Sequence, residues 1–288
     1  MDSWIIFSLL GAFFQSIEVC SQKYLLNTKE YNNVIAFFVF TIAGILFGII
    51  YFSLYGFIVY FNYLFWSSII IIVLLNFVAI YFLFKIMNEE DISYLMPHMS
   101  FSLLFTAMIS IFLLNEIPSI ISIVGICFIT AGAIYMDKAK KAKKQIGLKI
   151  KIMFFTVLLC YALCPPFFKI AIVNSNVLFV TFISHLFIGL SFFLFLFIIK
   201  EQHIIKHVLS FDKLKYVGSA VMAIALSNLS INYALSLTNV VNVIAIKRTS
   251  PVFVLIIGFF FLREKNFLGR KIISTVLMTI GSILLCVK

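Results

Sequence analysis

Long apolar runs separated by short polar segments fill almost the whole chain. The runs are bounded by charged residues, Pro, Gly or Asn, and each matches the length of a helix that crosses a hydrocarbon layer of roughly 30 Å. The pattern predicts an all-α integral membrane protein with ten transmembrane helices, at residues 4–24, 33–53, 64–84, 92–114, 119–136, 152–173, 177–199, 214–236, 240–262 and 270–287. Little sequence remains for a water-soluble domain.

The ten runs form two similar sets of five. A shift of 148 residues without gaps places Glu116 of the segment LLNEI on Glu264 of the segment FLREK. One further residue of shift matches Gly132 with Gly281, and Lys23 falls two residues from register with Lys169. The two halves therefore carry an internal repeat.

Three segments follow from this repeat: a first five-helix repeat at residues 1–137, a lysine-rich linker loop at residues 138–151, and a second five-helix repeat at residues 152–288. Because each repeat holds an odd number of helices, the second must lie inverted in the membrane relative to the first. Two inverted five-helix repeats create a pseudo-two-fold axis in the membrane plane. They also predict a site near mid-depth.

Composition agrees with this assignment, since 63% of the 288 residues are hydrophobic and only 11% are charged. A soluble domain is about half apolar and a quarter charged. The net charge of +11 reflects basic residues placed mainly between apolar runs. The loops after the odd-numbered helices hold 18 of the 22 Lys and Arg, whereas the opposite side holds Lys169 and Lys288. We expect the protein to lie in the cell (inner) membrane, and by the positive-inside rule we expect both termini on the side away from the cytoplasm. Because the basic residues are explained in this way, we expect no nucleic-acid partner.

Residues 236–285 resemble the C-terminal half of an EamA-type transporter of the drug/metabolite transporter superfamily. The residues that carry this resemblance are Ser250, Pro251, Glu264, Gly269 and Gly281, with Glu116, Gly125 and Gly132 as a weaker set in the first half. The resemblance implies a secondary carrier or exporter of amino acids, nucleotides, sugars, phosphorylated intermediates or lipophilic cations. It also implies cytoplasmic termini, which is the alternative to the orientation indicated by the basic residues.

An enzyme is not expected. The sequence has no paired carboxylates, Ser/His/Asp order or metal-ligand spacing in register across the apolar runs. It also lacks a G-x-x-x-x-G-K-[ST] element, so this chain alone could not use phosphate-bond energy. We therefore expect no cofactor and no metal site.

Lys247 and Arg248 are adjacent cations close to the middle of the ninth predicted helix. An ionised side chain at the centre of a helix costs about 2.5–3.5 kcal/mol, so such residues are expected to face a cavity or a partner. Neighbouring residues on a helix point about 100° apart, so at least one of the two should face the interior. One interpretation is an anion-binding site, and the other is pairing with helix-end carbonyls, with Glu18 or with water.

Glu18 is the acidic residue placed well inside a predicted span, in the first helix. Small multidrug resistance transporters, which are distant relatives, carry their coupling glutamate in the first helix eight residues before a lysine. Gln15 occupies that position here, and Glu18 lies one turn further along the same face. Glu18 is thus a candidate proton carrier or a salt-bridge partner of Lys247 or Arg248.

Further candidate substrate-binding residues are polar side chains near these positions. His98 lies in the fourth helix beside Met99 and Ser100, which occupy the repeat positions of Lys247 and Arg248. A lone histidine in a span also fits a hydrogen-bonded packing role. Asn232, Tyr233 and Asn242 belong to a polar cluster around the turn between the eighth and ninth helices, which a polar hairpin explains equally well. Pro97, Pro251 and the pair Pro165 and Pro166 remove backbone donors inside spans.

These observations favour a secondary transporter of a small polar metabolite, anionic or zwitterionic, that works by alternating access. The alternative is a proton-coupled exporter of amphipathic or cationic compounds, and a membrane scaffold without transport activity is a third interpretation. The expected partners are a small-molecule substrate, the lipid bilayer and a coupling proton or counter-substrate. The expected assembly is a monomer or a homodimer.

Overall fold

The computed structural model describes residues 2–26, 32–89, 92–140, 147–200, 211–260 and 268–284, and every regular element in them is helical. The first half contains α1 (Ser3–Leu25), α2 (Asn32–Tyr55), α3 (Tyr63–Glu89), α4 (Ile92–His98), the 3₁₀ turn η2 (Met99–Phe101), α5 (Ser102–Leu114) and α6 (Ile120–Lys140). The second half contains α7 (Leu148–Val173), α8 (Val177–Ile198), α10 (Phe211–Leu237), α11 (Val240–Lys247), α12 (Ser250–Phe260) and α13 (Leu268–Leu284).

Eight helical stretches among the described residues are long and apolar enough to cross a membrane, and two shorter apolar helices cover Ile120–Tyr135 and Ile272–Leu284. The all-helical prediction is therefore confirmed, while ten full spans remain a prediction. Helix also covers both ends of the predicted linker at residues 138–151, since α6 continues to Lys140 and α7 begins at Leu148. Lysine is a good helix former and keeps its charge in water at these helix ends.

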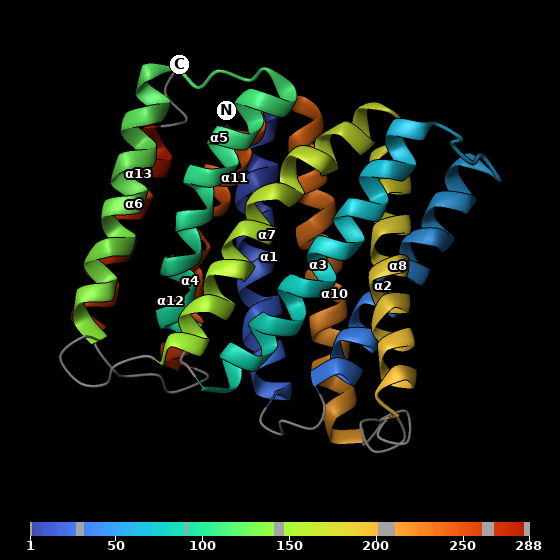
Figure 1. Cartoon of the computed structure of the whole chain (residues 1–288), viewed down its shortest axis with the longest axis horizontal. Helices are drawn as coiled ribbons and strands as arrows, with labels where there is room; N and C mark the ends of the chain where they lie inside the picture. The colour runs from blue at the N-terminus through green and yellow to red at the C-terminus, as the bar shows by residue number, and fades with distance from the viewer. Residues whose placement is uncertain are drawn as a thin grey trace.

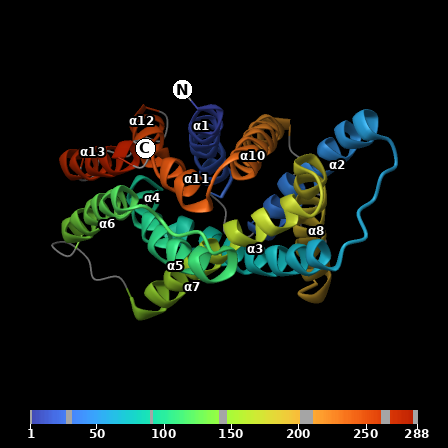
Figure 2. The ribbon, with the colours of Figure 1, turned by 90° about the horizontal axis from the view of Figure 1, so that it is seen from above.

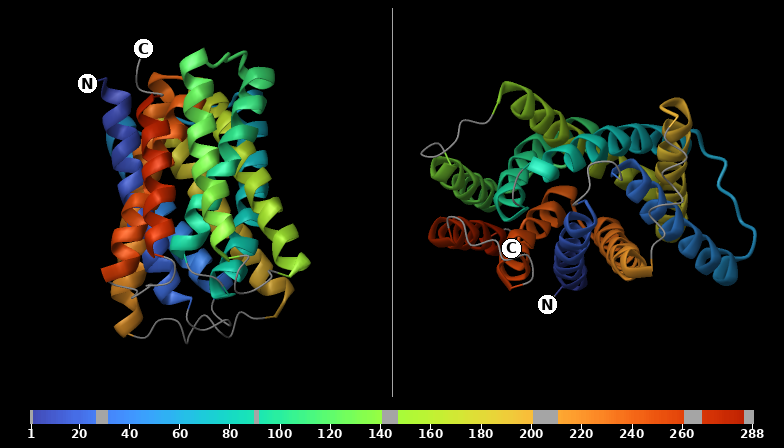
Figure 3. Two further views of the ribbon diagram at one scale, coloured as in Figure 1. Left: turned by 90° about the vertical axis from the view of Figure 1, so that its left-hand side faces the viewer. Right: turned by 90° about the horizontal axis from the view of Figure 1, so that it is seen from below.

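The two halves run in opposite directions. Figure 1 shows both chain termini at the same end of the bundle, so α1 starts there, whereas α7 starts at the other end. The main helix pairs are α1 with α10, α3 with α7, α2 with α8, and α6 with α13. The repeat makes α1 equivalent to α7 and α3 equivalent to α10. Exchanging the two halves therefore turns the pair α1–α10 into the pair α7–α3, whereas α2–α8 and α6–α13 are each turned into themselves. The packing thus follows a pseudo-two-fold axis, and Figure 3 shows the same bundle from the side and from below.

Small residues let the helices cross closely on this axis. In the α2–α8 pair, a Cβ atom added at Gly189 would lie 2.2 Å from Thr41 Oγ1 and 2.6 Å from Thr41 N. In the α6–α13 pair, a Cβ atom at Gly281 would lie 2.5 Å from the carbonyl oxygen of Gly125. Interfaces between membrane helices favour such residues because packing, and not exclusion from water, holds the helices together.

Helices four and nine are broken, although the apolar pattern predicts continuous spans at 92–114 and 240–262. The breaks fall at Met99–Phe101 and just after Lys247, which are equivalent positions at the 148-residue shift. Pro251 has no amide hydrogen, so it cannot donate to the carbonyl of Lys247 four residues earlier. Pro97 removes a donor inside α4 in the same way. By contrast, α7 runs unbroken through Pro165 and Pro166.

The α2–α8 crossing yields a test of this packing. We expect Gly189→Ala to lower the stability by about 1–3 kcal/mol because the new methyl group has no room. Gly218→Ala, also inside a helix but with nothing within 4 Å of the added Cβ, should be neutral or stabilising. Thermal unfolding of the purified variants measures both, and equal melting temperatures would contradict the close crossing.

Candidate functional site

A cavity of about 120 Å³ lies between the two halves of the bundle. In the view of Figure 2, α1 and α10 lie on one side of the bundle, and α3 and α7 lie on the other. Side chains from these four helices line the cavity, together with Phe40 of α2 and residues at or just before the breaks of helices four and nine. The polar lining residues are Gln15, Glu18, Gln22, Asn76, Tyr161, Cys164, Asn228, Asn232, Lys247 and Arg248.

Both cations of helix nine line this cavity. The ammonium of Lys247 makes no hydrogen bond to any residue that the structure describes, and it attracts the carboxylate of Glu18. Arg248 is 6% exposed, and its Nη2 donates to the hydroxyl of Ser102 at the start of α5. The buried Nε of Arg248 has no hydrogen-bond partner within the described residues. Two positive groups with unused donors thus border the cavity.

α1 contributes three polar side chains to the cavity wall, and one of them is acidic. Glu18 Oε1 accepts a hydrogen bond of 3.1 Å from Nε2 of Gln22, one turn further along the helix. Gln15 lies on the same face and lines the cavity, and its buried Oε1 lacks a hydrogen-bond partner in the described part of the chain. Because these residues are spaced by three and four positions, one helix face carries all of them.

The side-chain amides of Asn228 and Asn232 in α10 form hydrogen bonds with residues of α8. Asn228 Nδ2 lies 3.0 Å from His185 Nε2, and His185 Nδ1 lies 2.7 Å from the carbonyl oxygen of Thr181. A neutral imidazole with its proton on Nδ1 satisfies both contacts. Asn232 Nδ2 donates to Thr181 Oγ1 at 2.9 Å. His185 therefore positions a lining residue and does not itself line the cavity.

The structure does not bring three of the predicted site residues into this cavity. His98 is buried and packs near the rings of Phe101 and Phe154. Tyr233 is 45% exposed, and its ring lies 5.2 Å from that of Phe7. Asn242 lines a second cavity with Glu116, at the end of the bundle that carries both termini.

Gln22, Asn76 and Tyr161 are among the polar lining residues that were not predicted as site residues. Gln22 could have been found because it follows Glu18 by one helical turn. Asn76 is the one amide in a long apolar run of the third helix, which is also a usable signal. Tyr161 gives no such signal, since tyrosine also packs in apolar helices and at membrane boundaries.

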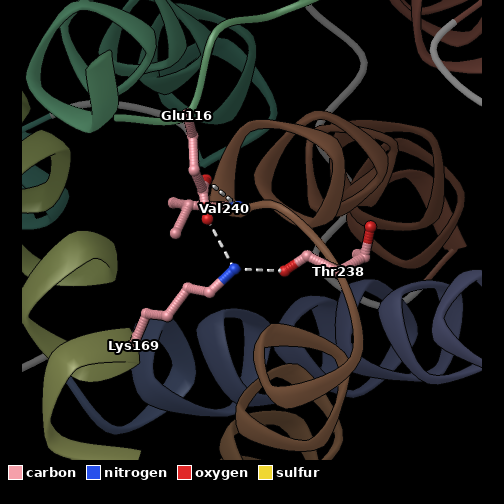
Figure 4. Close-up of polar contacts among 4 residues, drawn as sticks. All are labelled: Glu116, Lys169, Thr238 and Val240. Carbon is pink, nitrogen blue, oxygen red and sulfur yellow. Dashed lines mark hydrogen bonds and ion pairs between the residues drawn. The ribbon is translucent and has the colours of Figure 1, made fainter. Parts of the chain in front are cut away.

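An ion pair lies at the end of the bundle that carries both termini. Figure 4 shows Lys169 of α7 reaching Glu116, in the connection between α5 and α6, at 2.5 Å. Lys169 Nζ also donates to the carbonyl oxygen of Thr238 at 2.8 Å, and Glu116 Oε2 accepts from the amide of Val240 at 2.8 Å. The carboxylate thus caps the N-terminus of α11, where the helix dipole favours negative charge.

Lys23 makes the equivalent contact at the other end of the bundle. It lies near the end of α1, as Lys169 lies near the end of α7, and it donates to the carbonyl oxygen of Met87 in α3. Lys23 therefore connects the first helix of its half to the third, and Lys169 connects the first helix of its half to the residue that follows the third. Glu264, the repeat counterpart of Glu116, lies outside the described residues.

Two inverted helical halves around a charged cavity are typical of membrane transporters. A family model described as "EamA-like transporter family" matches residues 2–136 and 148–287, so the chain belongs to that family and is a multi-pass integral membrane protein. The predicted resemblance is confirmed, and membership of a transporter family agrees with the expectation that the chain is not an enzyme.

The similarity to a solved structure concerns the fold alone. A solved structure described only as "Crystal structure of protein" is similar with a TM-score of 0.72 at 11% sequence identity. The alignment covers 96% of this chain and 95% of that one. No curated protein matches the chain.

The Glu116–Lys169 pair should contribute to stability because Lys169 and Glu116 are only 18% and 10% exposed. Removing one partner leaves the other charge uncompensated, and for this partly buried pair the cost should lie below the about 3–5 kcal/mol of a fully buried one. We expect Glu116→Gln and Lys169→Met each to lower the melting temperature by several degrees. The double variant should lose less than the sum of the two. Additive losses measured in purified protein would show that the two side chains act independently.

Proposed function

We propose that this chain is a secondary transporter of a small anionic or zwitterionic metabolite and that it works by alternating access. The observation that carries the proposal is the pair Lys247 and Arg248 at the central cavity, both with donors that no described residue uses. A charged side chain is costly inside a bilayer and is a functional candidate by default. A substrate anion would supply the missing acceptor.

The break in helix nine supports an anion more than a cation as the substrate. Lys247 ends α11 and Ser250 begins α12, so the N-terminus of a half-helix opens near Arg248. The positive end of the helix dipole favours negative charge at such a terminus. Lys247 also offsets the negative C-terminal end of α11, which helps the bundle to tolerate a cation there.

The repeat supports the mechanism. In inverted-repeat carriers, one half rocks against the other around a fixed central site, so each end opens in turn. The cavity here lies between the halves, and the contacts of Lys23 and Lys169 lie at opposite ends of the bundle. In this proposal, all ten apolar helices cross a cell membrane, and the end rich in basic residues faces the cytoplasm.

A thermal-shift screen of the purified chain against amino acids, sugar phosphates, nucleotides and organic cations tests the anion site. A ligand that binds only the folded form raises the melting temperature. We expect stabilisation by anions or zwitterions, and we expect Lys247→Gln and Arg248→Gln each to weaken that binding at least tenfold. Lys215→Gln, the same change at an exposed position of α10, is the control. Undiminished binding in both cavity variants would exclude this site.

A second candidate function is proton-coupled export of amphipathic or cationic compounds. The observation that favours it is the position of Glu18 on the cavity wall, where it is held by Gln22. A carboxylate in that place could exchange a proton for a cationic substrate.

Glu18→Gln separates the two functions. For an anion carrier, we expect this change to retain anion binding or to strengthen it several-fold, because a competing negative charge is lost. The same panel in the thermal-shift screen provides the measurement. Stabilisation of the unmodified chain by organic cations, lost in Glu18→Gln and kept in Lys247→Gln, would support the exporter instead.

A further inference from the structure

The cavity is built from equivalent positions of the two repeats. All but Phe40, Leu235 and Arg248 among the lining residues fall into pairs at a constant shift, which is 146 residues from α1 to α7 and 148 residues elsewhere. The pairs are Gln15 with Tyr161, Glu18 with Cys164, Val19 with Pro165, Gln22 with Phe168, Asn76 with Ile224, Ile80 with Asn228, Leu83 with Ile231, Phe84 with Asn232, Met96 with Ile244, and Met99 with Lys247.

The backbone frame is thus nearly symmetric, but its chemistry is not. In five pairs, one repeat position carries a strongly polar side chain and the equivalent position carries an apolar or weakly polar one. The polar members come from α1, α10 and α11, and their partners come from α7, α3 and η2. These five pairs are Glu18 with Cys164, Gln22 with Phe168, Asn228 with Ile80, Asn232 with Phe84, and Lys247 with Met99.

Besides the weakly polar Cys164, the α3–α7 side carries the polar residues Tyr161 and Asn76, and the amide nitrogen of Asn76 is already occupied. Its Nδ2 donates to the carbonyl oxygen of Ile72 at 2.8 Å and to Cys164 Sγ at 3.3 Å. Both acceptors belong to α3 and α7, so this donor is used within its own side of the cavity. The α3–α7 side therefore presents a mainly apolar surface, formed by Ile80, Leu83, Phe84 and Phe168 and extended by Met99 at η2.

Most of the polar lining residues are consequently on one side of the cavity. α1 packs against α10 and α11, which groups the polar residues on one wall, and α3 packs against α7, which forms the other wall. A solute that is polar all round would leave hydroxyl or charged groups against the apolar wall without hydrogen bonds. Each such group costs roughly 1–3 kcal/mol in proteins.

We propose that the cavity binds a small amphiphilic carboxylate, with its carboxylate at Lys247 and Arg248 and its apolar part against Phe84, Met99 and Phe168. This inference rests on the proposed anion site and adds the class of substrate. The formal charges of Lys247, Arg248 and Glu18 leave the polar wall with one net positive charge. A single carboxylate balances that charge, whereas a phosphate monoester carries about −1.5 to −2.

The test compares two acids on the purified full chain. Thermal shift and calorimetric titration with sodium 4-methylpentanoate and sodium succinate measure whether the apolar part contributes. We expect 4-methylpentanoate to bind at least tenfold more tightly than succinate, which corresponds to about 1.4 kcal/mol. This comparison needs no variant, so it remains valid if a substitution in the cavity impairs folding.

A substitution that copies the other repeat sharpens the test. Phe84→Asn places on the apolar wall the residue that its counterpart Asn232 carries, and it should weaken binding of 4-methylpentanoate at least tenfold. Leu64→Asn makes a comparable change at an exposed site in the first turn of the same helix and should leave binding unchanged.

The outcomes distinguish this inference from the proposed function. Binding of succinate as tight as that of 4-methylpentanoate, lost in Lys247→Gln, would overturn the amphiphilic substrate and leave the anion site intact. An absence of any 4-methylpentanoate binding at millimolar concentration would overturn the inference as well. Binding of either acid that persists in both Lys247→Gln and Arg248→Gln would remove the anion site itself.

Discussion

Two adjacent positive charges in the middle of an apolar bundle constrain everything around them. Lipid cannot solvate Lys247 and Arg248, so the fold must supply either partners or a polar space. It supplies both, because Arg248 donates to Ser102 while Lys247 borders a cavity with Glu18. The same place in the chain is where Pro251 interrupts the helix and leaves a carbonyl without its helical donor. The two cations and the interrupted helix both need polar surroundings, and the cavity between the two halves provides them.

The repeat explains where that cavity can be. Helix pairs that cross on the pseudo-two-fold axis, such as α2 with α8, are joined through glycine and leave no space. The pairs that exchange under the symmetry, α1 with α10 and α3 with α7, form separate walls with space between them. Both repeats also break their fourth helix at the equivalent position, but only the second break carries cations. A symmetric frame thus holds an asymmetric set of side chains, and the asymmetry is what gives the cavity a polar and an apolar wall.

Much of this architecture could be predicted from sequence because it depends on local signals. Apolar run length sets the helices, and the register of Glu116 with Glu264 and of Lys23 with Lys169 reveals the repeat. Which helix face lines the cavity depends instead on how each helix is rotated by its neighbours. Gln15, Glu18, Asn232, Lys247 and Arg248 line the cavity, whereas Tyr233 packs on Phe7 and Asn242 lies at one end of the bundle. Polarity alone could not separate these cases, since a polar residue near a helix end is satisfied by water or by a turn.

The two ends of the bundle differ from its centre in how they are held. Contacts on the axis are close backbone packing, which has few alternative arrangements, and they suit a pivot. The end contacts are made by long side chains, as in the bonds of Lys169 to Glu116 and Thr238 and of Lys23 to Met87. Hydrogen bonds and ion pairs of this kind can be exchanged for water when an end opens, at a net cost of about 1 kcal/mol for each neutral bond. On the proposed mechanism, the rigid crossings would keep the two halves aligned while the lysine contacts at the two ends break in turn.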